Sequence, residues 1–570
     1  MNELNMRYRL SYSAVFADMD ALVVLLAITG LCGALIGIRP VAAQDMIIRN
    51  GTVLTVTSGT HENTDVLVRD GRIAEIGVGL SAPDIKSIDA TGLYVMPGII
   101  DAHSHIAISS VNEGTAPTTP EVNVGDILEP YDIRLYRALA GGVTVSQLMH
   151  GSANVIGGQC ETVKHRYGVG DPDSLRMEGA PRTIKFALGE NPTRAHGNRG
   201  SSSDDVSLVP RTRMGVEFVI REAFNNAARY MDRWAAYDAD RESNSRLVPP
   251  PYSARLEVLA DILRGDIIVH AHSYRADEIL MLLDVLEEFG VDRIVFQHVN
   301  EGFKVAPELA DRGAMASVFS DWWAYKFEVY YSTAYNAAIL TRNGVVTSIN
   351  SDSPELNRHL YHEAAKSQRY GGLSDDESLA LITINPAKQL GIDDRVGSIE
   401  VGKEADLAVF SAHPLSIYAV PRMTIVDGVV RFDIDEDPDD MRLLVDPSEE
   451  IDAAAFTAKG RHLHQCLDGT FFGAAAAEAD AAGNGDGGAK VGWGVKSDGG
   501  AKADGEARAD GGAKADGGAR ADGGAKADGG ARADGGAKAD GGARADGGAR
   551  ADGGARADGD GRARAEAVRR

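Results

Sequence analysis

The chain is short of cysteine and of basic residues. It has three cysteines in 570 residues, and Cys32 lies in an N-terminal segment that we expect to be removed, which leaves Cys160 and Cys466. So few cysteines exclude a disulfide framework, as expected for a large chain with an ample core. Acidic residues outnumber basic ones by 83 to 58, for a formal net charge of −25. This balance argues against nucleic-acid binding by the folded part, because such binding needs cations that neutralise phosphates.

Bulky apolar residues are almost absent from the last part of the chain, residues 474–570. A six-residue unit, Ala-(Lys/Arg)-Ala-Asp-Gly-Gly, repeats through most of it, with cations in step at Lys502, Arg508 and Lys514. A segment of this composition cannot bury enough surface to offset the entropy lost on ordering, so we predict a disordered repeat tail. From residue 483 onward, 16 basic and 15 acidic residues nearly cancel, so the negative charge belongs to the rest of the chain.

A long apolar run stands near the N-terminus, from residue 21 to residue 38. Arg7 and Arg9 precede it, and the small residues of Val41-Ala42-Ala43 follow it. This order is typical of a secretory signal peptide, which we place at residues 1–43, and it predicts a secreted or periplasmic protein with no stable membrane span after cleavage. A retained membrane anchor is the alternative, because the run is close to the minimum spanning length.

The two flanks of the remaining chain share one pattern of short alternating strands. In residues 44–96 the strands are separated by Asn50-Gly51 and Asp70-Gly71, which are typical of hairpin turns. Residues 396–435 repeat the pattern around Asp427-Gly428. We therefore expect both flanks to combine into one small β-sandwich domain.

The middle of the chain, residues 97–395, alternates apolar strand candidates with helical stretches. That alternation is typical of parallel βα units and predicts an α/β fold, a (β/α)8 TIM-like barrel. A C-terminal extension, residues 436–473, would separate the composite β domain from the tail. The eight barrel strands are expected at 98–105, 143–150, 162–165, 183–189, 267–272, 293–298, 314–319 and 345–352.

The first predicted barrel strand ends in His103-Ser104-His105. Because side chains alternate along a strand, these two imidazoles can point to the same place, and imidazole is a common ligand of divalent metals. Such a pair is weak evidence by itself. The ends of later strands carry further candidates, and active sites of barrels are built at this face, so the sequence predicts a metal site there. The further candidates are Lys185, His270, His272, His298 and Asp352.

These motifs resemble those of the amidohydrolase superfamily, in its imidazolonepropionase-like and prolidase-like branch. The resemblance runs from about residue 46 to residue 432 and leaves out the repeat tail. The matching segments are 97–105, 183–192, 269–273, 296–298, 351–352, 383–387 and 397–407.

The resemblance implies a ligand set and a base. It assigns His103, His105, His270 and His298 as metal ligands, and Asp352 as both a ligand and the group that moves a proton from water to the leaving group. In binuclear members a lysine carboxylated by CO2 bridges two metals, and Lys185 matches its position. The implied cofactor is one or two divalent ions, with zinc as first choice and Mn, Fe, Co or Ni as alternatives.

Several assignments stay open at this point. Lys185 has an ordinary alternative as a strand lysine paired with Glu190, and Glu190 is itself an alternative metal ligand. His270 and His272 share a strand face, so their roles are interchangeable. An aromatic wall with arginines suits a peptide-like or carboxylate-bearing substrate, although the aromatics have an alternative role in packing helices on the barrel. The residues assigned to substrate binding are His272, Glu190, Trp322 and Arg194.

The expected activity is that of a metal-dependent hydrolase that uses metal-activated water on a C–N bond. The bond would belong to an amide, a dipeptide or a cyclic amide such as an imidazolone. A deaminase or lactonase on the same scaffold is an alternative, and so is a non-catalytic binding protein with the amidohydrolase fold. The expected partner is a small-molecule or short-peptide substrate, and a homo-oligomer is considered as well.

Overall fold

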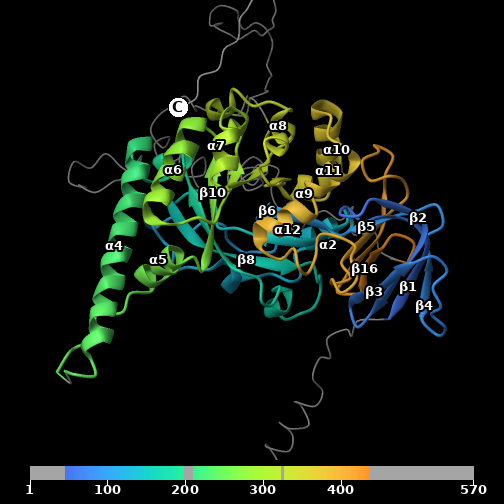
Figure 1. The fold of residues 1–570 in the computed structure, drawn as a ribbon, viewed down its shortest axis with the longest axis horizontal. Coiled ribbons are helices and arrows are strands. Elements are labelled where there is room, and N and C mark those ends of the chain that lie inside the picture. The colour runs from blue at the N-terminus through green and yellow to red at the C-terminus, as the bar shows by residue number, and fades with distance from the viewer. Residues whose placement is uncertain (1–44, 198–209, 245, 323–325, 437–570) are drawn as a thin grey trace, which may run out of the picture. The chain divides into compact units, whose positions relative to one another are not determined.

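The computed structural model describes residues 45–197, 210–244, 246–322 and 326–436 (Figure 1). The chain divides into two compact units, Met1–Ala474 and Ala475–Arg570, and every described residue belongs to the first. The expected signal peptide and repeat tail lie outside the described residues. No helix within the described ranges is both long and apolar enough to cross a membrane.

Both flanks of the chain build one sheet, drawn in blue and orange in Figure 1. Its strand order is β16-β15-β14-β5-β1-β2-β3, with β4 paired to β1, and the antiparallel pair β5–β14 joins the two flanks. The strands are hydrogen-bonded into one continuous sheet, so a sandwich of two sheets is not confirmed. The strands are β1 Met46–Leu54, β2 Thr60–Arg69, β3 Arg72–Gly77, β4 Lys86–Asp89, β5 Tyr94–Pro97, β14 Leu407–Phe410, β15 Pro421–Val426 and β16 Val429–Asp433.

Two of the three expected turns of this sheet have the expected conformation. Asp70-Gly71 and Asp427-Gly428 connect antiparallel strands with positive φ at both residues, as a tight hairpin requires. The expectation for Asn50-Gly51 was wrong, because β1 continues through it. The register of β1 against β2 shifts between Ile48 and Gly51, and Asn50 has φ 58°, so the pair forms a bulge inside the strand.

A second eight-stranded sheet follows the order of the chain, from β6 to β13. It corresponds to the expected TIM-like barrel, with one correction. The third strand, expected at 162–165 as a parallel strand, is the longer β8, which runs antiparallel to both neighbours. The reason is that only residues 149–155 connect it to β7, and a parallel crossover needs a dozen residues or more. The strands are β6 Ile99–Ser104, β7 Val143–Leu148, β8 Ile156–Lys164, β9 Arg182–Ala187, β10 Ile267–Ser273, β11 Ile294–His298, β12 Met315–Val318 and β13 Thr347–Ile349.

The barrel closes between β13 and β6 without a regular strand ladder. The segment 381–382 lies against both strands: Ile100 N donates to Ile382 O, and Ile349 N donates to Leu381 O, each at 2.9 Å. Beyond the end of β13, Asp352 N donates to the carbonyl oxygen of His103 in β6 at 3.1 Å. Single hydrogen bonds therefore hold this junction, which we call the β13–β6 junction.

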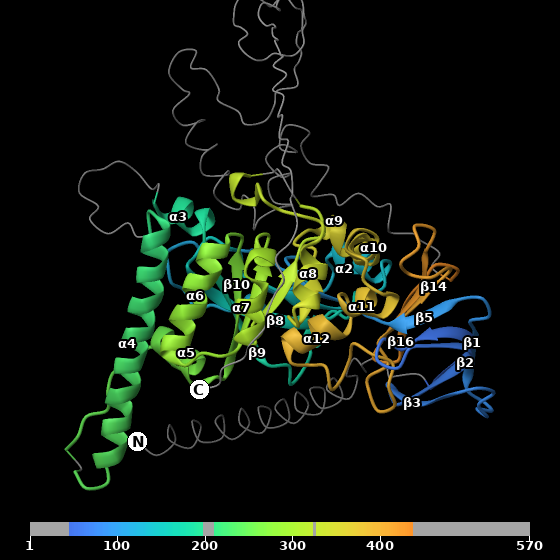
Figure 2. The same ribbon diagram turned by 45° about the horizontal axis from the view of Figure 1, so that its top comes forward.

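Helices cover the outside of the barrel, and the long α4 runs alongside α5 and α6 (Figure 1 and Figure 2). Buried residues of α4 recur at helical spacing, including Val216, Ile220 and Phe224, and this apolar stripe explains its packing. The helices are η1 Val124–Ile127, α2 Ile133–Leu139, η2 Pro172–Leu175, α3 Glu190–Gly197, α4 Arg213–Asp240, α5 Ala254–Arg264, α6 Ala276–Phe289, η3 Gly302–Lys304, α7 Ala306–Asp311, η4 Phe327–Val329, α8 Asn336–Arg342, α9 Pro354–Asn357, α10 Leu360–Gly371, α11 Asp375–Ala380 and α12 Ile384–Leu390.

A buried ion-pair cluster connects the barrel to the small sheet. Lys164, at the end of β8, lies 2.8 Å from Glu404, 2.8 Å from Asp406 and 2.9 Å from Asp427. Burial disfavours the charge of Lys164, but the three carboxylates outweigh it and hold the pKa of the ammonium above its ordinary value. The carboxylates come from the C-terminal flank, so this cluster ties residues far apart in sequence.

Candidate active site

Three predicted site residues converge where β6 and β13 end. One ligand atom from each of His103, His105 and Asp352 can be chosen so that all lie within 4.8 Å of one another, a spacing that suits one metal ion. Nε2 of His105 is 3.2 Å from Asp352 Oδ1, and Nε2 of His103 is 3.6 Å from the same oxygen. From the end of β11, His298 places Nε2 3.8 Å from Asp352 Oδ2. The structure therefore brings together residues from the first, sixth and last strands of the barrel sheet.

Lys185 belongs to the same cluster. It lies on β9, is fully buried, and its Nζ is 3.1 Å from His103 Nε2. Its ammonium also donates to the carbonyl oxygen of His150 at 3.1 Å. The side chain thus ends beside the first histidine of the pair, where the resemblance places a bridging lysine.

Gln297 contacts His103 and His270 in opposite ways, because it accepts a hydrogen bond from one and donates to the other. Its Oε1 is 3.1 Å from Nδ1 of His103, and its Nε2 donates to Nδ1 of His270 at 3.0 Å. A donor on Gln297 leaves the proton of neutral His270 on Nε2, so neither ring nitrogen of His270 has a free lone pair. For His103 the same amide accepts the Nδ1 proton, which leaves the Nε2 lone pair directed at Asp352 and Lys185.

His272 is better placed for a metal than His270. Its ring centroid is 4.8 Å from that of His298. Both ring nitrogens of His272 and both of His298 are buried without a hydrogen-bond partner in the described part of the chain. Buried polar atoms in proteins normally have partners, so these orphaned nitrogens are suited to binding a cation. In His270, which the resemblance assigns as a ligand, only Nε2 is without a partner, because Nδ1 accepts a hydrogen bond from Gln297.

The protonation states of the cluster also fit a metal. Burial lowers the pKa of His298 to about 3 and that of His272 well below its ordinary value, so both rings are neutral near pH 7. Burial raises the pKa of Asp352, but the hydrogen bond from His105 and nearby positive charge outweigh it, and the pKa is lowered. Neutral imidazoles and an ionised carboxylate are the forms that bind divalent ions.

The backbone is strained at two of these residues. His298 has φ 71° and Asp352 has φ 46°, both in the left-handed region that non-glycine residues seldom adopt. Such conformations persist where surrounding contacts hold them, and they concentrate at functional sites. The positive φ at His298 has a second effect. Gln297 and His298 are consecutive, so in a regular strand their side chains would face opposite sides, whereas here both contact the cluster.

An aromatic stack surrounds His298. Phe319 stacks on its ring at 4.5 Å and Tyr274 lies at 5.6 Å with an interplanar angle of 25°. Trp322, predicted to bind substrate, stacks on Phe319 at 4.2 Å. Its ring therefore packs against Phe319 in the wall of the site, and its role toward a substrate stays a prediction. Lys326 makes a cation–π contact with Tyr274, with its Nζ 4.4 Å from the ring centroid.

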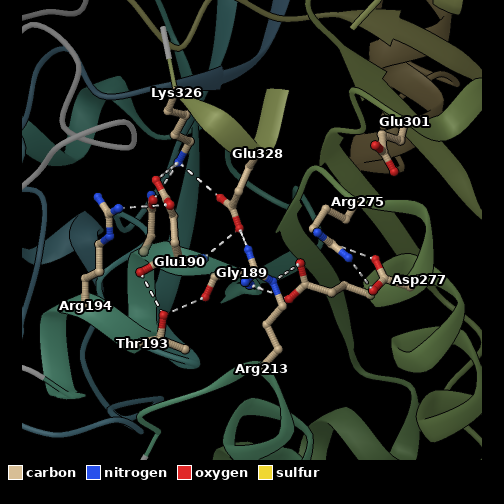
Figure 3. Close-up of polar contacts among 12 residues, drawn as sticks. Gly189, Glu190, Thr193, Arg194, Arg213, Arg275, Asp277, Glu301, Lys326 and Glu328 are labelled. Atoms are coloured by element: carbon tan, nitrogen blue, oxygen red, sulfur yellow. Dashed lines mark hydrogen bonds and ion pairs between the residues drawn. The ribbon is translucent and has the colours of Figure 1, made fainter. Parts of the chain in front are cut away.

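Glu190 and Arg194, two more predicted substrate-binding residues, lie on α3 in the polar network of Figure 3. Glu190 pairs with Arg194 at 3.2 Å and with Lys326 at 3.7 Å. Lys326 also donates to Asn191 Oδ1 at 2.8 Å and lies 3.5 Å from Glu328. Glu190 is thus engaged with cations of this network.

The network continues away from the metal cluster through Arg213 at the start of α4. Arg213 pairs with Glu278 at 3.0 Å and with Glu328 (Figure 3). Glu278 accepts a hydrogen bond from Gly189 N, and Glu328 accepts one from Glu190 N, each at 2.9 Å. Alternating cations and carboxylates therefore hold together the loops that follow β9, β10 and β12.

Sequence reasoning gave no role to five residues that shape this site. Asp101 stands two positions before His103 in β6, so strand alternation offered a signal that was not used. Gln297 lies in the matching segment 296–298, in which only His298 was given a role. For the rest, no local pattern distinguishes a wall residue from a packing residue. The five residues are Asp101, Tyr274, Gln297, Phe319 and Lys326.

Comparisons with known proteins indicate the family of this chain. The sequence profile of the amidohydrolase family matches residues 251–435. The amidohydrolase tasK of Hapsidospora irregularis is 33% identical over 399 residues, which are 65% of this chain and 40% of that protein. A dihydroorotase of Ruminiclostridium cellulolyticum is 48% identical over 61 residues, 11% of this chain and 14% of its own length. The chain thus spans well under two thirds of these curated relatives.

A solved structure gives fuller coverage. An amidohydrolase from Thermotoga maritima is 34% identical, with a TM-score of 0.62, and the match covers 68% of this chain and 100% of that one. At this identity and coverage the likeness extends beyond a shared barrel to the whole of the related chain. The protein is therefore a member of the amidohydrolase superfamily.

Proposed function

We propose that this protein is a metal-dependent hydrolase that cleaves a C–N bond with an activated water molecule. The observation that carries the proposal is the convergence of His103, His105, His298 and Asp352 at one point. Of these, His298 is neutral and Asp352 is ionised, the forms that bind divalent ions. Membership of the amidohydrolase superfamily supports it. Within the superfamily, we propose that the protein belongs to the imidazolonepropionase-like and prolidase-like branch.

The ligands we propose are His103, His105, His298 and Asp352, with His272 in place of His270. Lys185 stands next to His103. Carboxylated by CO2, it would help to hold a second ion, whereas as an ammonium it would remain a cation beside a single ion. A bound divalent ion would lower the pKa of water toward neutrality and polarise the scissile carbonyl.

The protein's own groups would move the proton. Asp352 is an ionised, buried carboxylate, and the imidazoles of His105 and His298 each approach a different one of its oxygens. It would take a proton from the attacking water and deliver it to the leaving nitrogen, a role that suits a carboxylate held within hydrogen-bonding reach of both atoms. The rings around His298 would exclude bulk water from the reacting groups.

For the substrate we propose a small amide, a short peptide or a cyclic amide. Curated relatives that match short segments of this chain are named for dihydroorotate and hydantoin. Trp322 supplies an aromatic surface beside the cluster, and Glu190 and Arg194 would contact polar substrate groups from α3. Secretion or export to the periplasm and assembly into a homo-oligomer belong to the proposal as expectations from the sequence.

Metal content per chain tests the proposal, measured on the full-length protein purified with bicarbonate and reconstituted with zinc. We expect about two equivalents in the wild type, and about one or fewer in Lys185→Ala. His272→Asn and His270→Asn form a matched pair, in which the first should lose metal and the second should retain it. The same samples are assayed on dipeptides, N-acyl amino acids and cyclic amides.

Three results would change the proposal. One equivalent that is insensitive to Lys185 would indicate a mononuclear site of the deaminase or lactonase kind. Metal loss in His270→Asn but not in His272→Asn would reverse the assignment of the two histidines. A protein that contains no metal and resists reconstitution would favour a non-catalytic binding protein.

A further inference from the structure

The β13–β6 junction carries both halves of the candidate metal cluster and has little backbone pairing to hold them. His103 lies in β6 and His105 directly follows it, whereas Asp352 lies three residues beyond β13. The sheet order runs from β13 to β6 without a ladder between these two strands. Something other than strand pairing must therefore set the distance between the histidines and the carboxylate.

Asp101 occupies this junction. Its carboxylate is fully buried on β6 and accepts four hydrogen bonds. One comes from its own strand, from His103 N at 3.3 Å. The other three come from the segment around Asp352: Ser351 N at 3.1 Å, Ser351 Oγ at 2.5 Å and Asn357 Nδ2 at 2.6 Å.

These contacts surround Asp352 in the chain. Ser351 immediately precedes it, and Asn357 ends the short helix α9 that follows it. Asp352 itself adopts φ 46°, a conformation that needs support from its neighbours. The N–H of Asp352 donates directly to His103 O in β6. Asp101, also in β6, binds the chain before Asp352 at Ser351 and after it at Asn357.

We propose that Asp101 is the positioning residue that sets the Asp352 carboxylate against His103 and His105. The inference rests on the proposed function, because it assumes that Asp352 acts in the reaction. It goes further, because it assigns the geometry of that cluster to a residue outside the proposed ligand set.

A carboxylate suits this position for a chemical reason. It is an acceptor only, and all four groups that point at it are donors. An asparagine at position 101 would direct its own NH2 group at the NH2 group of Asn357. Two buried donors would then face each other without an acceptor between them. Exchanging the two residues restores complementarity, because the amide at position 101 could then donate to a carboxylate at position 357.

That exchange is the test. The variants are Asp101→Asn, Asn357→Asp and the double variant D101N/N357D, assayed on a substrate that the wild type hydrolyses. Asp65→Asn is the matched control, since Asp65 is 1% exposed and accepts from Arg49, Asn50 N and Leu80 N in the small sheet, far from the cluster in sequence. Zinc affinity by titration calorimetry is measured on every variant.

We expect Asp101→Asn to lower kcat by about 10²-fold with KM changed less than about threefold, because a displacement of a reacting group by about 1 Å costs that much. The double variant should recover kcat to within about fivefold of the wild type. Asp65→Asn should reduce thermal stability and leave kcat unchanged. Should Asp101→Asn fold too poorly to assay, the comparison of Asn357→Asp with the double variant decides, since only the exchange restores the pairing.

The inference is overturned if the double variant is no better than the worse single variant, or if Asp101→Asn keeps wild-type kcat and zinc affinity. A wild type that hydrolyses none of the substrates would count against the proposed function alone. The zinc titration would then still report on Asp101, because a displaced His103 or Asp352 weakens zinc binding and the exchange should restore it.

Discussion

At the scale of single residues, the site buries polar and charged side chains, and without a bound cation their burial would cost free energy of folding. Asp352 and His298 have no exposed side-chain surface, and Lys185 is buried beside them. An ion that binds only the folded form stabilises it, so the same groups serve both ligand binding and stability. The histidines contribute as neutral rings because burial makes their protonation unfavourable.

Asp352→Asn should retain the fold and lose the proton-transfer step. We expect kcat to fall by about 10²- to 10⁴-fold, since an amide cannot accept the proton of the attacking water. Steady-state kinetics measure the effect, with metal content determined on the same sample. Asp321→Asn, which removes a partly exposed partner of Lys366, is the control and should change kcat little. Near-full activity of the metal-loaded Asp352→Asn enzyme would show that another group moves the proton.

At the scale of secondary-structure elements, buried ion pairs connect segments that no strand pairing joins. The Lys164 cluster joins β8 to the loops around β14 and β15, and the network of Figure 3 joins the starts of α3, α4 and α6. Removing one partner of such a cluster leaves uncompensated charge in a buried place. Substituting a member of either cluster should therefore lower the free energy of unfolding.

Lys164→Met should destabilise the protein by about 3–5 kcal/mol, because Glu404, Asp406 and Asp427 would repel one another without the ammonium. Chemical denaturation monitored by tryptophan fluorescence measures the free energy of unfolding. Lys388→Met, at an exposed position of α12, is the matched control and should change it by less than about 0.5 kcal/mol. Equal stability of the two variants would mean that the cluster does not hold the barrel and the small sheet together.

Glu278 predicts a pH dependence of stability. Burial raises its pKa from 4.5 to about 7, against the attraction of Arg213. Between these values the folded state binds more protons than the unfolded state, so the free energy of unfolding falls as pH rises from about 4.5 to about 7. The loss is at most about 3 kcal/mol and stays in place at higher pH.

Glu278→Gln should remove this slope. Denaturation of both proteins from about pH 4.5 to about pH 8.5 should show the variant gaining stability relative to the wild type as pH rises. Glu287→Gln, at an exposed position of the same helix, should run parallel to the wild type. Parallel curves for Glu278→Gln as well would place the pKa of Glu278 near its ordinary value.

At the scale of the whole molecule, every residue of the candidate site is among the described residues, whereas the expected repeat tail is not. A chain that ends at Phe472 should keep the kcat/KM and melting temperature of the full chain, because the tail has few apolar side chains to bury. Differential scanning calorimetry and kinetics of both forms measure this. A fall in melting temperature of more than about 4 °C on truncation would show that the tail packs on the folded part.

Much of the architecture was predictable from the sequence. Strand alternation and Asp-Gly turns indicated the small sheet, and the alternation of strands and helices indicated the barrel, because these patterns arise from local backbone geometry. The direction of β8 was missed since the short connection 149–155 was not weighed against the length of a crossover. The bulge at Asn50 was missed because the same two residues are typical of a hairpin turn.

For the site, the sequence by itself determined which chemistry-bearing side chains are available: the pair His103 and His105, the later histidines, and Asp352 after β13. Spacing along single strands suffices for that, because strand ends in a barrel share one face. Only the tertiary structure decided how they are used. The separation of His270 from His272 by Gln297, the stack on His298 and the support of Asp352 by Asp101 all depend on contacts between distant segments, and no local pattern encodes such contacts.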